Sequence, residues 1–381
     1  MALGAAAALS AAAGAALGPI PSQAQDAESP LQLTIEDFEA APLGRTPYLW
    51  KTAAKNALGS EVGAEVVRED GVRKGKRLNF KYSFGKTASG NDYLSAGPGR
   101  RPLPGNLQAI VTTLTGDGAG NTFFLRLRDR TGERFDYGGR VSWTGPKRIR
   151  LRLMPPPKGS VGGNRNGKLD LPLTFDRVGV RRASGGKRMG TLGVGPLLAE
   201  VKFPQVQTLY DAAKSLDQGA WRAVGRNATV NEIGNQIQKY RGEDRPVLRL
   251  GYSYQAEGDA SVEFRRTLTA GAGHGTFLLD VFGDGSNNIL RVRAEDGTGR
   301  VFQANIPSIL VDWAGWKTIY LDTRTLRDPN AVDPDEVMSK FPVKFHSLVV
   351  DDVSGRDQLP GVESGRTGEL FLGRIAFAGE K

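Results

Sequence analysis

The 381-residue chain contains no cysteine and only two histidines. The absence of cysteine excludes disulfides, thiol catalysis and metal sites that need cysteine ligands. Histidine is the usual acid–base group near neutral pH. However, His274 lies in a glycine-rich turn and His346 beside an apolar strand, and neither is spaced with a partner for a metal site or a triad. No phosphate loop, nucleophile elbow or dinucleotide fingerprint stands out. We therefore expect no enzymatic activity of its own and no cofactor.

No later stretch is apolar enough to span a membrane, and the run from Leu3 to Leu17 is too short to do so. Its length suits the apolar region of a signal peptide, and residues 22–24 (Ser-Gln-Ala) place small residues at the cleavage positions. No Lys or Arg precedes the run, so we expect the true start codon to lie upstream. The prediction is a signal peptide over 1–24, a mature N-terminal segment over 25–30, and a secreted, periplasmic or cell-surface protein. The alternative is an Ala-rich helix or a disordered leader.

Helix-period hydrophobic runs are scarce in this sequence, whereas glycine (50) and proline (21) are plentiful. Short stretches of alternating apolar and polar residues are bounded by Gly, Asn and Asp. This pattern is typical of strands joined by turns. The sequence therefore predicts an all-β fold, and its length predicts two or three domains at about 100–200 residues each.

The chain repeats itself. Residues 116–135 and 283–302 align without a gap, and nine of the twenty positions are identical. Both copies contain a Gly-Asp-Gly turn, a strand, an Asp-x-x-Gly turn and a second strand ending in Phe. Residues 78–84, 172–175 and 190–192 match 248–254, 342–345 and 368–370 in the same order. A period near 170 residues is too long for a solenoid. We therefore expect a duplicated domain, with modules over 31–201 and 205–379 joined by 202–204.

These segments carry a family resemblance. An opening Asp37-Phe38-Glu39, the Gly-Asp-Gly turn, the Asp-x-x-Gly hairpin, Trp313-Ala314-Gly315-Trp316 and a closing Gly-x-Leu strand occur in that order. The chain resembles carbohydrate-binding modules of the family-eleven type and the related domain of complex I intermediate-associated proteins. The resemblance implies two tandem jelly-roll β-sandwiches of the galactose-binding-like kind and, more weakly, glycan binding. It also implies a structural Ca²⁺, for which Asp37 and Glu39 are the candidate ligands.

Two departures from this pattern separate the repeats. Pro146 stands where the second repeat has Trp316, and the second repeat has Leu209-Tyr210-Asp211 in place of Asp37-Phe38-Glu39. The family's ligand positions are therefore not carried over. Of the five tryptophans, four fall at comparable places in the two repeats, which favours core positions over sugar platforms. Asp117 and Asp284 are interpreted as turn formers.

Charge divides the repeats. Residues 31–201 carry 29 Lys+Arg and 15 Asp+Glu, a net of +14, whereas residues 202–381 carry 22 and 24, a net of −2. In two stretches of the first repeat arginines alternate with apolar residues, so the arginines should point outward from a sheet. Neighbours on one strand face would lie about 6.6 Å apart, and their repulsion of roughly 0.6 kcal/mol in water rises to about 2.5 at a dielectric of 20. Such a face must be solvated or bind anions.

The candidate binding residues are the following: Arg126, Arg128, Arg148, Arg150, Arg152, Arg291, Arg293 and Tyr320. The preferred hypothesis is a carbohydrate-binding protein whose first module takes acidic polysaccharide or another polyanion. One alternative is that the arginines only solubilise the surface, with salt links to Asp129, Glu133 and Asp136. The others are a structural or protein-interaction module of an envelope assembly, a polysaccharide hydrolase and, least favoured because of the expected export, a nucleic-acid-binding protein.

Overall fold

A computed structural model describes residues 30–47, 49–69, 72–86, 92–215, 220–255, 259–304, 309–331, 336, 338–352 and 365–379. The predicted signal peptide, 1–24, lies outside the described residues. Residues 31–381 belong to one compact unit. Within the described ranges there is no helix with the length and hydrophobicity that a membrane span requires.

The described residues of the first repeat form thirteen strands. They are β1 (Leu31–Glu36), β2 (Lys51–Lys55), β3 (Glu61–Glu69), β4 (Val72–Ser83), β5 (Tyr93–Gly97), β6 (Arg101–Pro102), β7 (Leu107–Asp117), β8 (Asn121–Arg128), β9 (Arg134–Val141), β10 (Thr144–Arg152), β11 (Thr174–Arg181), β12 (Met189–Val194) and β13 (Leu197–Val201).

The described residues of the second repeat form twelve strands and a short 3-10 turn. They are β14 (Gln205–Asp211), β15 (Arg222–Arg226), β16 (Ala228–Tyr240), β17 (Glu243–Tyr254), β18 (Ser261–Gly271), β19 (Gly275–Asp284), β20 (Ile289–Glu295), β21 (Val301–Gln303), β22 (Ile309–Leu310), β23 (Ala314–Asp322), η2 (Thr323–Thr325), β24 (Val343–Asp351) and β25 (Thr367–Gly379).

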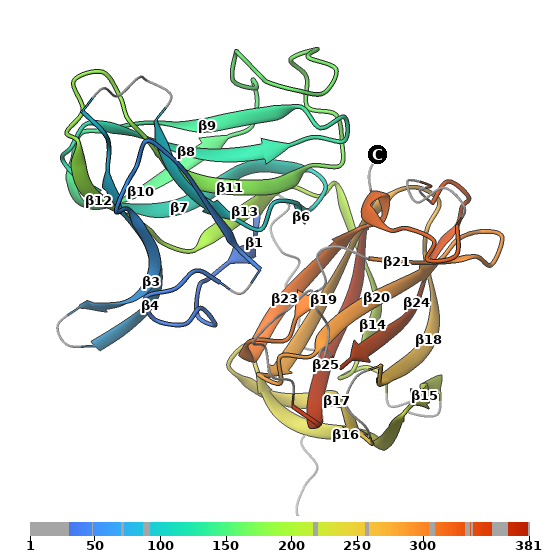
Figure 1. Cartoon of the computed structure of the whole chain (residues 1–381). Helices are drawn as coiled ribbons and strands as arrows, with labels where there is room; N and C mark the ends of the chain where they lie inside the picture. The colour runs from blue at the N-terminus through green and yellow to red at the C-terminus, as the bar shows by residue number, and fades with distance from the viewer. Residues whose placement is uncertain are drawn as a thin grey trace, which may run out of the picture. The chain divides into compact units, whose positions relative to one another are not determined.

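Each set of strands makes two sheets. In the first set, sheet A runs β1-β13-β7-β12-β4-β3 with β10 beside β7, and sheet B runs β2-β5-β11-β8-β9 with β6 beside β11. In the second set, sheet C runs β16-β17-β25-β19-β23 with β14 beside β25, and sheet D runs β15-β18-β24-β20-β21 with β22 beside β20. Figure 1 shows β19, β23 and β25 of sheet C side by side.

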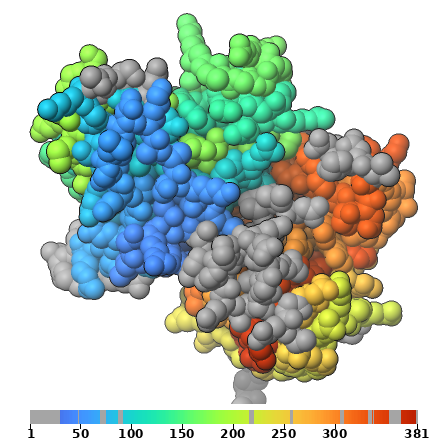
Figure 2. Space-filling view, in the orientation of Figure 1, coloured from blue at the N-terminus to red at the C-terminus, as the bar shows by residue number. Residues whose placement is uncertain are grey.

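The two sets share one pairing scheme. The hairpin β3–β4 corresponds to β16–β17, β7–β10 corresponds to β19–β23, and the long β25 takes the places of both β12 and β13. No strand pairing among the described residues joins one set to the other, and each set keeps to its own region of the visible surface (Figure 2). The fold class predicted from sequence, all-β with two tandem jelly-roll sandwiches, is confirmed. The first set ends at Val201 and the second begins at Gln205, which supports our proposal of domains over 31–201 and 205–379.

Each core is formed by the apolar residues that alternate with outward-facing residues along the strands. Phe123, Leu125 and Leu127 of β8 are at most 1% exposed and face the opposite sheet. Ile149 and Leu151 of β10 pack against the same cluster, as their alternation with arginine predicted. The second sandwich has an equivalent cluster around Val292, Phe302 and Phe345.

The residues that match best between the repeats turn out to hold turns and strand ends together. Asp117 of the first Gly-Asp-Gly turn accepts hydrogen bonds from the Ala119 amide at 2.9 Å and the Tyr82 hydroxyl at 2.5 Å. Asp284 likewise accepts hydrogen bonds from the Ser286 amide at 3.0 Å and the Tyr252 hydroxyl at 3.2 Å. The interpretation of both aspartates as turn formers agrees with these contacts.

The second turn shows the same equivalence. Asp129 Oδ1 accepts hydrogen bonds from the Thr131 hydroxyl and the Glu133 amide, at 2.8 and 2.9 Å. Asp296 does the same for Thr298, at 2.7 Å from its hydroxyl. A side chain that bonds to the backbone a few residues ahead stabilises a tight turn. Identity at these positions therefore reports shared turn geometry and carries no information about a ligand.

Three of the tryptophans lie in the cores: Trp50 and Trp221 are 5% exposed and Trp313 is 8% exposed. Phe38 packs edge-on against Trp50 with a centroid distance of 5.5 Å, and Tyr210 packs edge-on against Trp221 at 5.7 Å. Tyr210 therefore takes the place of Phe38 in the second repeat. The different opening residues preserve one packing contact, because an aromatic ring of either kind fills the space beside the indole.

We expect Gly368→Ala to destabilise the protein by about 1–3 kcal/mol, because overpacking a filled site forces its neighbours apart. An added Cβ would lie 2.2 Å from Asp284 Oδ2 and 2.3 Å from the Tyr252 hydroxyl oxygen. The matched control is Gly273→Ala in the same sandwich, whose Cβ would meet no atom within 4 Å. Urea denaturation of both variants tests this, and equal stability would contradict the packing described here.

Candidate functional site

The structure places the predicted arginines of the first sandwich on two different sheets. Arg126 and Arg128 project from the outer face of sheet B, on β8. The other row, Arg148 to Arg152, lies on β10 in sheet A. Both rows point away from the core, as predicted. The two rows do not form one surface, because the hydrophobic core lies between the sheets that carry them.

The β10 row is solvated. Arg148, Arg150 and Arg152 are all exposed. Arg150 Nε lies 2.5 Å from a carboxylate oxygen of Glu200 on β13. No ion pair joins Arg148 or Arg152 to another described residue. Water therefore screens most of their mutual repulsion, and this row is an exposed cationic strip.

The β8 row is held more firmly. Arg126 makes a two-pronged contact with Asp136 of β9, at 2.7 and 2.9 Å, and Arg181 of β11 reaches the same carboxylate at 2.7 Å. Burial pushes the pKa of Asp136 upward, but the hydrogen bonds from Arg126 and Arg181 outweigh burial and leave the pKa below its ordinary value. Asp136 is therefore ionised at neutral pH. Arg128 pairs separately with Asp176, at 3.2 Å.

An outward-facing aromatic ring supports the same two guanidinium groups. Phe124 lies on the outer face of sheet B, yet it is only 3% exposed. The guanidinium carbons of Arg126 and Arg181 lie 5.6 and 5.0 Å from its ring centroid. A cation over an aromatic face is attracted to the ring. Phe124 and Asp136 together thus fix both arginines in position.

A cavity of about 210 Å³ opens beside these arginines. The segment 157–161, between β10 and β11, forms part of its wall. Its charged lining residues are Arg126, Arg134, Lys158, Arg181 and Asp136. Four cations against one carboxylate give a net charge of +3. Arg134 and Lys158 are exposed, and no ion pair joins either of them to another described residue. The cavity therefore combines two cations held by Asp136 with two exposed cations that have no ion pair among the described residues.

The predicted residue Arg126 belongs to this cavity, whereas Arg134, Lys158 and Arg181 were missed from sequence. Val178 and Val180 of β11 point into the core, so the next residue, Arg181, points outward, and this direction could have been predicted from the sequence. Lys158 lies in a loop without periodicity, and nothing local places it beside β8. Glu133, expected as a salt link, instead accepts hydrogen bonds from the amides of Asn166 and Gly167 at 3.2 and 3.1 Å.

The corresponding face of the second sandwich is neutralised. Arg291 pairs with Asp351, and Arg293 lies 3.0 Å from a carboxylate oxygen of Glu263. Arg265 contacts the other oxygen of Glu263 at 2.7 Å. The predicted binding residues Arg291 and Arg293 therefore lie on the expected outer face, on β20, but both already have carboxylate partners.

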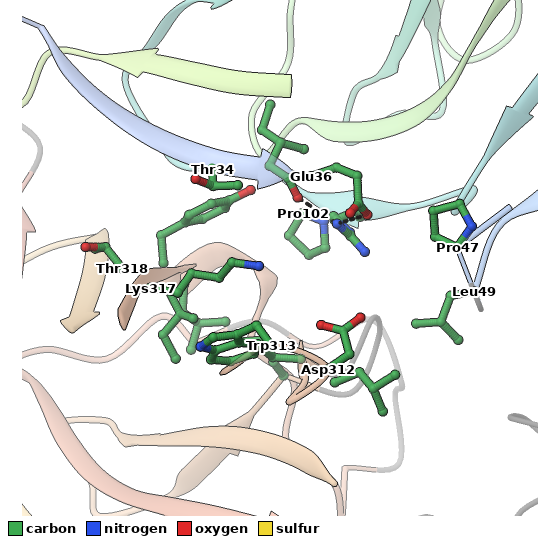
Figure 3. A pocket seen from close by; sticks show the side chains of 17 residues that line it. Thr34, Glu36, Pro47, Leu49, Pro102, Asp312, Trp313, Lys317 and Thr318 are labelled. Atoms are coloured by element: carbon green, nitrogen blue, oxygen red, sulfur yellow. Dashed lines mark hydrogen bonds and ion pairs between the residues drawn. The ribbon is translucent and has the colours of Figure 1, made fainter. Parts of the chain in front are cut away.

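Tyr320 occupies a different environment from its counterpart Arg150. Leu278, Ala376 and Ala378 of sheet C belong to the buried cluster of the first sandwich, and Tyr320 packs against that cluster. The face that carries arginines in the first sandwich is thus apolar and covered in the second. Tyr320 lines a separate cavity there, shown in Figure 3. It lies in a recess between strands and does not form an open platform.

The carboxylates suggested for calcium already have partners within the protein. Asp37 lies 3.0 Å from the Lys317 ammonium, and Glu39 accepts a hydrogen bond from the Lys76 amide at 2.8 Å. The Lys76 ammonium donates to the carbonyls of Glu39 and Ala41. Among the described residues, no group of three acidic or histidine side chains is arranged so that it could hold a metal ion. This arrangement does not fit the six to eight oxygens that Ca²⁺ requires, and the calcium prediction remains without a mapped site.

We expect Asp136→Ala to destabilise the protein by about 1–3 kcal/mol at pH 7, because two half-buried guanidinium groups lose their charged acceptor. The pKa of Asp136 is lower in the folded chain than its ordinary value, so its contribution is present above about pH 4 and is lost as the pH falls further. Asp259→Ala is the control, because its contact with Arg226 has both side chains about two-thirds exposed, 66% and 65%. That change should have an effect of at most about 1 kcal/mol. Urea denaturation at pH 7 and pH 3 measures the free energy of unfolding of both variants. If the destabilisation caused by Asp136→Ala were as large at pH 3 as at pH 7, this account would be contradicted.

Comparison with known proteins gives structural likenesses only. No family model matches the chain, and no curated protein matches it in sequence. A family 11 carbohydrate-binding module of a cellulosomal cellulase of Clostridium thermocellum is 17% identical, over 45% of this chain and 96% of its own, with a TM-score of 0.30. The tandem CBM22 domain of Paenibacillus barcinonensis Xyn10C is 14% identical, over 92% and 98%, with a TM-score of 0.26. Likenesses at this level assign neither a family nor a ligand to the chain.

Proposed function

We propose that the protein is an exported, non-catalytic carbohydrate-binding protein whose first sandwich binds an acidic saccharide. The observation that carries this proposal is the cavity on sheet B, where four cationic side chains and one carboxylate leave a net charge of +3. The resemblance of the sequence motifs to carbohydrate-binding modules motivates the choice of saccharides among anionic ligands.

The fixed arginines supply the preorganised part of the site. A guanidinium group presents two parallel donors that match a carboxylate or sulfate. Arg126 and Arg181 are already ordered by Asp136 and Phe124, so a ligand that contacts them loses little side-chain entropy on binding. Each guanidinium retains N–H groups beyond those that Asp136 accepts, since arginine has five.

The two exposed cations, Arg134 and Lys158, supply the remaining charge. Arg134 lies on β9 and Lys158 in the loop before β11, and both line the cavity. Because neither pairs with another described residue, an anionic group would be their first close counterion. Binding should therefore be driven by charge and weaken with added salt. The β10 strip would add long-range attraction for the same polyanion without a specific contact.

The second sandwich would not share this ligand. Its equivalent arginines pair with Asp351 and Glu263, so an anion would have to displace a carboxylate that is already in place. Acidic-saccharide binding is therefore proposed for the first sandwich alone.

We expect the mature protein to bind tri-galacturonate and not cellotriose, as measured by isothermal titration calorimetry. The double variant Arg134→Ala, Lys158→Ala should weaken binding at least tenfold at 20 mM NaCl, since it removes two of the four cations. The matched double variant Arg148→Ala, Arg152→Ala, on the other sheet, should weaken it by at most about twofold. Raising the salt to 200 mM should remove most of the affinity.

Several outcomes would contradict the proposal. Equal binding of the neutral trisaccharide, or affinity that does not change with salt, would exclude charge recognition. A larger effect of the β10 variant would place the site on sheet A. Turnover of a polysaccharide would favour a hydrolase, and a stable co-purifying protein without glycan binding would favour a protein-interaction module.

Export gives a separate prediction. Expressed in a bacterial host from its native gene, with the upstream start codon that the sequence predicts, the protein should appear outside the cytoplasm, and its mature chain should begin after Ala24, where small residues satisfy signal-peptide cleavage. N-terminal sequencing and intact mass of the exported fraction measure this. Retention of residues 1–24 in a cytoplasmic product would contradict it.

A further inference from the structure

A second cavity, of about 120 Å³, lies among β1, β6, β22 and β23. One water molecule needs roughly 10–15 Å³ of such space, so the cavity is large enough for a small ligand or several waters. Figure 3 shows Glu36 and Asp312 on opposite walls with their carboxylates directed into the same space. Trp313 lies below them, with Lys317 above its ring.

Glu36 already has partners. One of its oxygens accepts a hydrogen bond from the Phe38 amide at 3.0 Å, and the other lies 2.8 Å from the Arg101 guanidinium. Arg101 also donates to the carbonyl of Ile35 at 2.6 Å. The charge on this wall is therefore balanced within the protein.

The remaining cation, Lys317, is also paired. Its ammonium lies 3.0 Å from Asp37 and 5.0 Å from the ring centroid of Trp313. The two cations that line the cavity, Arg101 and Lys317, are therefore held by Glu36 and Asp37. Neither is left to act as the counterion of Asp312.

Asp312 is the exception. It is half-buried, and no hydrogen bond or ion pair joins its carboxylate to another described residue. Burial and the nearby Glu36 raise the pKa of Asp312 to about 6, against the opposing effects of Lys317 and Arg101. At pH 7 it is therefore mostly ionised. A charged carboxylate without a donor, in a sheltered cavity, is costly.

The charged groups that face Asp312 can be summed. Glu36 and Asp37 come from β1 and the segment after it, Arg101 from β6, and Lys317 from β23. With Asp312 itself, three carboxylates and two cations give a net charge of −1 at pH 7. The walls around this charge include the apolar side chains of Leu310 and Trp313. Negative charge with apolar walls favours a cation that also carries hydrocarbon.

We propose that this cavity is a second binding site, for a small ligand with an ammonium group on a compact ring, such as an amino sugar, and that Asp312 is its counterion. The ammonium would donate to the carboxylate of Asp312, and the ring would rest against Trp313. A neutral ligand of the same shape would leave the charge unpaired and should bind less well. This site differs in charge and location from the basic cavity, so neither proposal depends on the other.

The test compares glucosamine with N-acetylglucosamine on the mature protein, by ligand-observed NMR titration at pH 7. These probes share a ring and differ in the charge on nitrogen. Glucosamine should bind at least tenfold more tightly, and Asp312→Asn should remove that preference. Because Asp312 titrates near pH 6, the affinity for glucosamine should fall about tenfold between pH 7 and pH 5. Asp259→Asn, remote and exposed, should leave both affinities unchanged.

A stability measurement shows that the variant is folded. The pKa of Asp312 is higher in the folded chain than its ordinary value, so its ionised form destabilises the native state above about pH 6. Asp312→Asn should therefore melt at a higher temperature than the wild type at pH 7, and the difference should shrink as the pH falls toward 4. Equal binding of the two sugars, or glucosamine affinity unchanged in a folded Asp312→Asn, would overturn the proposal.

Discussion

The packing of two sheet faces against each other is the constraint on which the rest of the structure depends. Side chains such as Phe123, Leu125 and Leu127 must all point inward to fill the space between sheets A and B. Because side chains alternate along a strand, every second residue is then forced outward. Phe124 and Arg126 of β8 point outward for this reason, and so do the arginines of β10. The core thus decides which positions can interact with a ligand, while the sequence at those positions decides which ligand.

The duplication has left the inner faces alike and made the outer faces different. The contacts shared by the two sandwiches, such as those of Asp117 and Asp284 with buried tyrosines, serve turns and packing. The β10 face is cationic and solvated in the first sandwich, whereas the equivalent face around Tyr320 is covered by the other sandwich. A covered face cannot carry unpaired arginines without a large desolvation penalty. The difference in net charge between the repeats follows in part from which face each one buries.

Counterions determine the chemical character of the remaining surfaces. On sheet B, Asp136 serves two arginines and leaves the cavity positive. On sheet D, Arg291 has Asp351 to itself and the surface is nearly neutral. In the cavity beside Trp313, two cations are balanced by two carboxylates and Asp312 is left over. The same fold thus presents cationic, neutral and anionic recesses, according to how many carboxylates each group of basic residues meets.

The sequence by itself determined those features that depend on residues close together in the chain. Two-residue alternation and turn chemistry depend on neighbours in the chain, so the strand through Arg126, the turn at Asp117 and the repeat of about 170 residues could all be predicted from it. The partners of the charged residues could not. Arg181 contacts Asp136, 45 positions away in the sequence, and Asp312 faces Glu36 only because the fold brings the segment before β23 next to β1. Ionic pairing over such separations depends on strand order and on sheet-to-sheet contact. Only the tertiary structure therefore decided that Arg134 and Lys158 join the basic cavity and that Asp312 has no ion pair with another described residue.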